Sequence, residues 1–182
     1  SYENSKRRLS KREDAPDKEA KLEEYDRHLV SLAVMKEELL AKRERIIELA
    51  EEDGQSFQVV FDAMKMDKKD PQRAEAIEAG LVEAIELPKR LLKELVEVYS
   101  WQIHLYRVSK KTIMNDNFAG SHLLLAAIET MCDNIWVNVE MLKGKAQKDR
   151  QLASYHEIRH EIDEISQAIA AYRKDFWPDR EA

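Results

Sequence analysis

The sequence predicts an all-α protein folded as an antiparallel up-and-down bundle of long helices. Its 182 residues contain only four glycines and four prolines, too few for many turns. Ala, Leu, Glu, Lys and Arg, which favour helices most strongly, dominate the chain. In addition, residues 115–142 are apolar on almost every side of a helix, a pattern typical of a buried element.

The composition narrows the range of functions. A net charge of −6 with both signs intermixed argues against a general nucleic-acid binder. No apolar run approaches the roughly twenty residues that a membrane-spanning helix requires, and no signal-peptide pattern stands at the start. Cys132 is the single cysteine, so we expect no internal disulfide, a buried inert thiol and a cytoplasmic protein.

Apolar periodicity and helix-breaking residues divide the chain into segments within one domain, residues 1–182. Residues 1–17 are polar and expected to be flexible, with a break at Pro16. Gly54 is expected to end or kink the first long helix, and Pro88 either to kink a helix or to begin one. The helical segments predicted in this way are 17–52, 57–64, 72–86, 88–112, 115–142 and 146–173.

A line of polar side chains runs along the predicted central helix. Asp116 and Asn134 are eighteen residues apart and therefore point in the same direction, and Asn138 lies one turn further on. Polar groups in a buried helix need hydrogen-bonding partners, so another element must meet this line. At 1.5 Å per residue, Asp116 and Asn134 are roughly 27 Å apart, too far to share a site within one chain.

Four short motifs stand in a definite order along the chain: Asp53 followed four residues later by Phe57, the step Glu86-Leu87-Pro88, the pair Asn115-Asp116, and Asn134-Ile135-Trp136-Val137-Asn138. In order and spacing they resemble the cyclodeaminase/cyclohydrolase family of folate enzymes, over roughly residues 20–145. This family includes the cyclodeaminase domain of formiminotransferase-cyclodeaminase and small methenyltetrahydrofolate cyclohydrolases.

The resemblance implies a homodimeric helical bundle that acts on a tetrahydrofolate derivative without a metal. Water attack by a cyclohydrolase and ammonia loss by a cyclodeaminase both remain open. Asp116 is the candidate catalytic acid/base, although its position equally suits a helix N-cap. The candidate substrate-binding residues are Asp53, Phe57, Lys110, Asn115, Asn134 and Asn138.

The implied dimer offers a way to join the two ends of the central helix. In an antiparallel two-fold pair, Asp116 of one chain would approach Asn134 and Asn138 of the other. Asparagine side chains both donate and accept hydrogen bonds, as the amide and amine edge of a pterin requires. Lys110 and Lys111 would attract a polyglutamate tail or simply be exposed.

Three departures from the family pattern support a second hypothesis. The glycine-rich run that opens the family's first helix is absent, and Ser1 stands where that helix would be ending. Lys110 replaces the usual asparagine, and Phe118 stands at a usual glycine, where its ring would fill ligand space. The alternative is therefore a non-catalytic helical homodimer that keeps the fold without the activity.

Residues 156–160 read His-Glu-Ile-Arg-His, a literal match to the zinc motif H-E-x-x-H. The spacing places His156 and His160 on one helix face. However, Arg159 would add a fixed positive charge between the ligands, and a third ligand is found only at Asp175 or Asp179. We therefore expect two exposed histidines and no metal.

Overall fold

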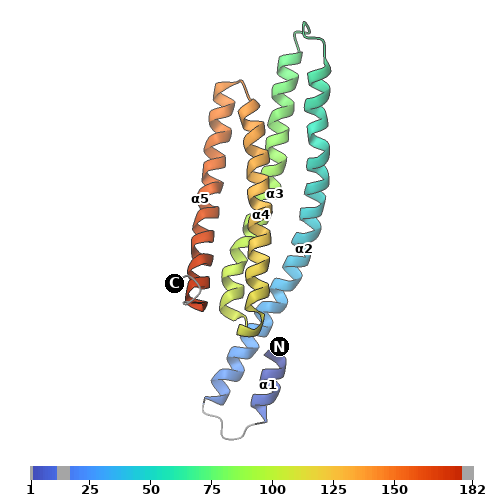
Figure 1. Cartoon of the computed structure of the whole chain (residues 1–182). Coiled ribbons are helices and arrows are strands. Elements are labelled where there is room, and N and C mark those ends of the chain that lie inside the picture. The colour runs from blue at the N-terminus through green and yellow to red at the C-terminus, as the bar shows by residue number, and fades with distance from the viewer. Residues whose placement is uncertain (1, 12–16, 178–182) are drawn as a thin grey trace. The chain divides into compact units, whose positions relative to one another are not determined.

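The computed structural model describes residues 2–11 and 17–177, and every regular element in these ranges is helical. In chain order the elements are α1 (Tyr2–Ser10), α2 (Lys18–Lys65), α3 (Arg73–Val108), the short 3₁₀ helix η1 (Lys111–Ile113), α4 (Met114–Met141) and α5 (Lys145–Phe176) (Figure 1). The predicted all-α class is confirmed.

The chain forms two compact units, and the boundary falls within α2, after Glu44. In the first unit, α1 packs on the beginning of α2: Lys6 forms an ion pair with Asp26, and the Tyr2 and Tyr25 rings lie 5.5 Å apart. A helix thus forms in part of the segment expected to be flexible, whereas the predicted break at Pro16 lies outside the described residues. The flexibility and the single-domain organisation remain predictions.

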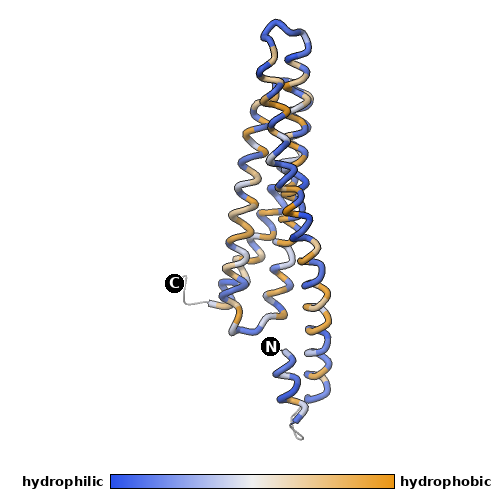
Figure 2. Tube along the Cα trace, turned by 90° about the vertical axis from the view of Figure 1, so that its right-hand side faces the viewer, coloured by the Kyte–Doolittle hydropathy of each residue, from blue (hydrophilic) through white to orange (hydrophobic). Residues whose placement is uncertain are grey.

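The second unit contains residues 45–65 of α2 together with α3, α4 and α5, which follow one another up and down (Figure 1). A hydrophilic turn joins α2 to α3 (Figure 2). Between the helices lies one apolar core, whose fully buried members include Leu49, Val60, Ile85, Leu92, Ile128, Ile135, Val139 and Ile162. This arrangement confirms the antiparallel bundle.

The predictions that a helix ends at Gly54 or begins at Pro88 are wrong, whereas a kink at either residue remains a prediction. Gly54 lies inside the continuous helix α2, and Pro88 lies inside the continuous helix α3. A glycine in a helix costs about 1 kcal/mol relative to alanine, and a proline about 3 kcal/mol. The buried side chains around Pro88, including Leu91 and Leu92, offset this cost because each contributes about 1.5–3 kcal/mol of hydrophobic stabilisation.

Two glycines allow helices and turns to approach closely. At Gly80, an added Cβ would lie 3.3 Å from the Val60 backbone, so the absence of a side chain lets α3 pack against α2. At Gly144, in the turn between α4 and α5, the backbone N–H donates a 3.0 Å hydrogen bond to Oε1 of Glu78. The other carboxylate oxygen of Glu78 accepts from the Lys143 N–H at 3.3 Å, so one side chain on α3 fixes this turn.

Candidate functional site

A pocket of about 370 Å³ lies in the second unit, among α2, α3 and the C-terminal half of α4. Four of the seven residues that the sequence suggested for a site line it together. The complete lining is Asp53, Gly54, Ser56, Phe57, Ala84, Asn134, Val137, Asn138 and Met141. The pocket therefore brings Asp53 and Phe57, from one motif, next to both asparagines of another.

Asn138 is fixed by a helical irregularity in α3. Its side chain is 5 % exposed, and its Nδ2 donates a 2.9 Å hydrogen bond to the Ala84 carbonyl oxygen. In a regular helix this carbonyl would accept from the N–H four residues later, but that residue is Pro88, which has no N–H. Asn138 thus satisfies the acceptor that Pro88 leaves without a helical donor, and α4 is tied to α3 beside the pocket.

Asp53 and Asn134 form a polar part of the pocket wall, in addition to the hydrogen bond between Asn138 and Ala84. Both are half-buried, and Nδ2 of Asn134 lies 3.5 Å from Oδ2 of Asp53, at the outer limit of a hydrogen bond. Burial raises the pKa of the Asp53 carboxyl above its usual value, because desolvation disfavours the charged form. The pocket wall therefore holds a carboxyl group whose proton affinity is increased, which suits a general acid/base.

The α2 side of the pocket combines a flat ring with open space. The Phe57 side chain is 42 % exposed, so part of its ring is available to a ligand. Gly54 lies one turn earlier and also lines the pocket, and a Cβ built on it meets no atom within 4 Å. The missing side chain of Gly54 leaves room beside Phe57 for a planar group.

A sequence profile of the formiminotransferase-cyclodeaminase family matches residues 17–173. This chain belongs to that family. The motifs Asp53/Phe57 and Asn134/Asn138 line the pocket, and Pro88 of a third motif frees the carbonyl that Asn138 binds. In this family member, motifs far apart in sequence therefore converge on one place.

The fold also resembles a solved structure. The crystal structure of formiminotetrahydrofolate cyclodeaminase from Thermotoga maritima matches with a TM-score of 0.61 and 16 % sequence identity. The match covers 94 % of this chain and 78 % of that one. The similarity supports the fold assignment. A search of curated proteins found no match.

The other three predicted site residues lie elsewhere in this family member, at the start of α4. Asn115 and Asp116 are exposed, Lys110 is half-buried just before η1, and none of them lines the pocket described above. The alternative interpretation of Asp116 as the helix N-cap is wrong. The 3₁₀ turn of η1 runs directly into α4, so the cap position is Ile113 and Asp116 lies in the first helical turn.

Phe118 does not occupy the pocket of Asp53. Its side chain is 4 % exposed and packs against Tyr106 and Trp177, each with ring centroids 4.8 Å away. The ring therefore fills space at the opposite end of α4 from the asparagines. The substitution for glycine leaves the candidate site unobstructed.

The zinc motif lies on the solvent side of α5. His156 and His160 are exposed, and Nε2 of His160 is 3.7 Å from Oε1 of Glu164. Arg159 turns inward instead and forms an ion pair with Glu129. Within the described ranges, no three His, Cys, Asp or Glu side chains are grouped as metal ligands, and no helix is long and apolar enough to cross a membrane.

Cys132 is 1 % exposed in the core of the bundle, as predicted. Burial raises the pKa of its thiol, which opposes formation of the nucleophilic thiolate. The thiol therefore belongs to the packing of α4 and not to the candidate site.

Sequence reasoning missed three contributors to the pocket: Gly54, the Ala84 carbonyl, and Pro88 behind it. The signal for two of them was present. A proline within an otherwise apolar helical pattern leaves one carbonyl without a helical donor, four residues earlier. A nearby asparagine on an otherwise apolar helix supplies a matching donor. Gly54 offered no comparable signal, because a glycine near a predicted helix end ordinarily indicates a stop.

Proposed function

We propose that this chain is a folate-dependent one-carbon enzyme that binds a tetrahydrofolate C1 adduct in the pocket of Asp53, Phe57, Asn134 and Asn138. The observation that carries the proposal is the convergence of these four residues, from two separated motifs, around one cavity of about 370 Å³. That volume lies within the range of small-molecule sites. Membership of the formiminotransferase-cyclodeaminase family supports the choice of ligand.

The pocket offers groups suited to a pterin. Asn134 can donate and accept hydrogen bonds at the ring edge, and the exposed part of the Phe57 ring can stack on a flat heterocycle. Asn138 donates one amide N–H to the Ala84 carbonyl oxygen. This bond fixes the orientation of the whole side-chain amide, including its second N–H and its oxygen. The pocket is thus pre-organised on its α4 side.

The reaction requires few groups. In a methenyl adduct the bridging carbon is already electrophilic. A water molecule adds to it while a carboxylate accepts a water proton, and the C–N bond then breaks as the nitrogen is protonated. In a formimino adduct, a second nitrogen of the folate attacks the same type of carbon and closes a ring, and ammonia leaves with a proton. Either course uses one acid/base group with a pKa closer to neutral than that of an ordinary carboxyl.

We assign this proton transfer to Asp53, because it is the ionisable side chain in the pocket lining and burial raises its pKa. Asp116 remains the candidate from the sequence, and its use would require a second copy of the chain. In a two-fold dimer, Asp116 of one protomer would complete the pocket of its partner. The two assignments make different predictions.

The decisive experiment measures binding and turnover of methenyl- and formiminotetrahydrofolate by the full-length protein. We expect binding of at least one substrate, with turnover that falls about 100-fold or more in Asp53→Asn. If neither substrate binds at high concentration, the protein is not a folate enzyme. Turnover of only one substrate would distinguish a cyclohydrolase from a cyclodeaminase.

Mixing variants tests the shared site. If Asp53 and Asp116 act on the same substrate across a dimer, Asp53→Asn and Asp116→Asn are each inactive, but their mixed dimers contain one intact site. Random pairing would then restore about a quarter of the wild-type sites. Full activity of Asp116→Asn alone would leave Asp53 as the acid/base and remove Asp116 from the mechanism.

A further inference from the structure

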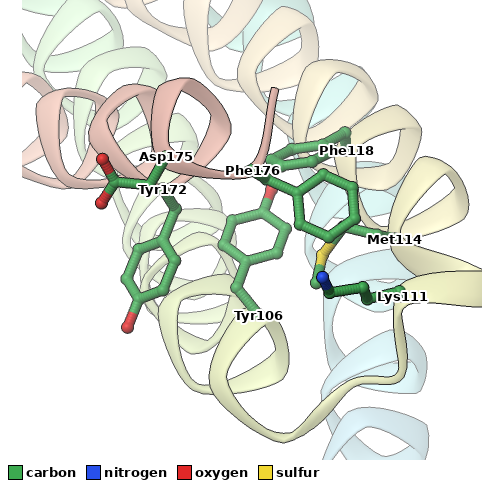
Figure 3. Close-up of a pocket in the computed structure, with 7 residues that line it drawn as sticks. All are labelled: Tyr106, Lys111, Met114, Phe118, Tyr172, Asp175 and Phe176. Carbon is green, nitrogen blue, oxygen red and sulfur yellow. The ribbon is translucent and has the colours of Figure 1, made fainter. Parts of the chain in front are cut away.

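A second pocket, of about 280 Å³, lies at the other end of the bundle, where α3 ends, α4 begins and α5 ends. Its lining is unusually aromatic: Tyr106, Lys111, Met114, Phe118, Tyr172, Asp175 and Phe176 (Figure 3). Between Phe118 and Asn134, α4 rises roughly 24 Å, so this pocket is separate from the proposed folate site.

The aromatic side chains of the wall are held by contacts with one another and with residues outside the lining. The Tyr106 ring lies 4.8 Å from Phe118 and 5.8 Å from Tyr172, centroid to centroid. The Tyr106 hydroxyl shares a hydrogen bond with Ser121, and Nε of Arg107 donates a 2.6 Å hydrogen bond to the Tyr172 hydroxyl. Because these rings are already fixed, ligand binding would cost little side-chain conformational entropy in the pocket wall.

One charge is directed toward the rings. The Lys111 side chain extends toward Tyr106 and Phe176, whereas the Asp175 carboxylate points away from them (Figure 3). Lys111 forms no ion pair with the residues that the structure describes. Burial raises the pKa of Tyr106, so its phenol stays neutral and does not compete for the lysine. The pocket thus combines flat apolar walls with an ammonium group that makes no ion pair within the described ranges.

We propose that this pocket binds a small aromatic carboxylate, a single ring bearing one carboxylate group. The ring would pack against the half-buried Tyr172 and Phe176 side chains that line the cavity. The carboxylate would pair with Nζ of Lys111. A volume of about 280 Å³ accommodates a single substituted ring.

Benzoate is a suitable probe, because it consists of one ring and one carboxylate. Titration of ¹⁵N-labelled full-length protein, followed by nuclear magnetic resonance, should give a dissociation constant on the order of a millimolar. The largest shifts should occur at residues 106–118 and 172–177. Benzyl alcohol, which lacks the charge, should bind more weakly, and benzylamine more weakly still. Equal binding of all three compounds would overturn the proposal.

Two lysine variants separate a specific ion pair from general surface charge. Lys111→Gln should weaken benzoate binding about three- to tenfold and leave benzyl alcohol unaffected. Lys174→Gln removes an exposed lysine on α5 that does not line the pocket, so it should change neither affinity. An equal loss in both variants would indicate nonspecific attraction and contradict the proposed site.

A third variant tests the ring, and a competition experiment tests the location. Phe176→Ala should weaken both benzoate and benzyl alcohol, while circular dichroism reports whether the helices remain folded. Methenyltetrahydrofolate should not displace benzoate, because the two pockets lie at opposite ends of α4. Displacement of benzoate together with shifts around Asp53 would place it in the folate pocket and refute a second site.

Discussion

Polar residues lie on the same side of α4 near both of its ends, but the two groups have different surroundings. At the C-terminal end, Asn138 is buried and bonded to Ala84, and Asn134 lies beside Asp53 in the wall of a pocket. At the N-terminal end, Asn115 and Asp116 are exposed within the first turn. One stripe of the sequence therefore corresponds to two distinct environments.

The difference arises from the neighbouring helices. At the C-terminal end, α3 contains a proline and α2 contains a glycine, which provide an acceptor and an open space. Near the start of α4, the neighbouring side chains on α3 and α5 are aromatic rings packed on Phe118. In this bundle, the polar residues of α4 that line the pocket lie beside these irregularities of α2 and α3.

The largest expected effect concerns Asn138 and Pro88. Asn138→Ala leaves the buried Ala84 carbonyl unpaired and should lower the free energy of unfolding by about 1–3 kcal/mol, measured by urea denaturation. In a Pro88→Ala background the new N–H at position 88 can bond that carbonyl, so the loss caused by Asn138→Ala should shrink. An equal loss in both backgrounds would show that the two residues are not coupled.

Gly54 should reveal an opposition between stability and binding. Gly54→Leu adds a side chain at the pocket and should weaken methenyltetrahydrofolate binding about tenfold or more, measured by calorimetric titration. The same change should raise the free energy of unfolding by about 0.5–1 kcal/mol, because leucine favours a helix over glycine. Gly54→Ala is the matched control: it should give a similar stability gain with little loss of binding.

Asp116 provides the contrast to Asn138 at the other end of the helix. Asp116→Asn removes a negative charge from the first turn of α4 and should lower the free energy of unfolding by about 0.3–1 kcal/mol at low salt. The loss should diminish as salt is added, because an exposed charge is screened. A loss as large as that of Asn138→Ala would mean that Asp116 has a buried partner.

The smallest effect concerns the pH dependence of stability at Asp53. Its pKa is raised in the folded state, so the folded chain holds this proton more tightly than the unfolded chain does. Its contribution to stability is therefore present below the unfolded pKa and decreases as pH rises through the folded pKa. Asp53→Asn should flatten this part of the curve and give a small stability gain at neutral pH, measured by urea denaturation. A steeper pH dependence of the free energy of unfolding in Asp53→Asn would contradict a raised pKa of Asp53 in the folded chain.

The helical class and four of the nine pocket-lining residues could be predicted from the sequence, because apolar spacing and ordered motifs encode them. Helix ends were less accessible, since packing around Pro88 outweighed the local preference for a break. The burial of Lys89 had no sequence signal either. Its side chain is 4 % exposed and donates to Gln151, which lies 62 residues away on α5. Such pairings depend on how helices align, and local propensity does not determine that alignment.

The bond between Asn138 and Ala84 also has a consequence for how α4 aligns with α3 along their length. A slide of one helical turn would move α4 by about 5.4 Å along α3. Such a slide would leave the Ala84 carbonyl buried without a donor and move Asn134 away from the level of Asp53. The missing N–H of Pro88 therefore contributes to the alignment of α4 with α3, and so to the position of Asn134 and Asn138 in the candidate site.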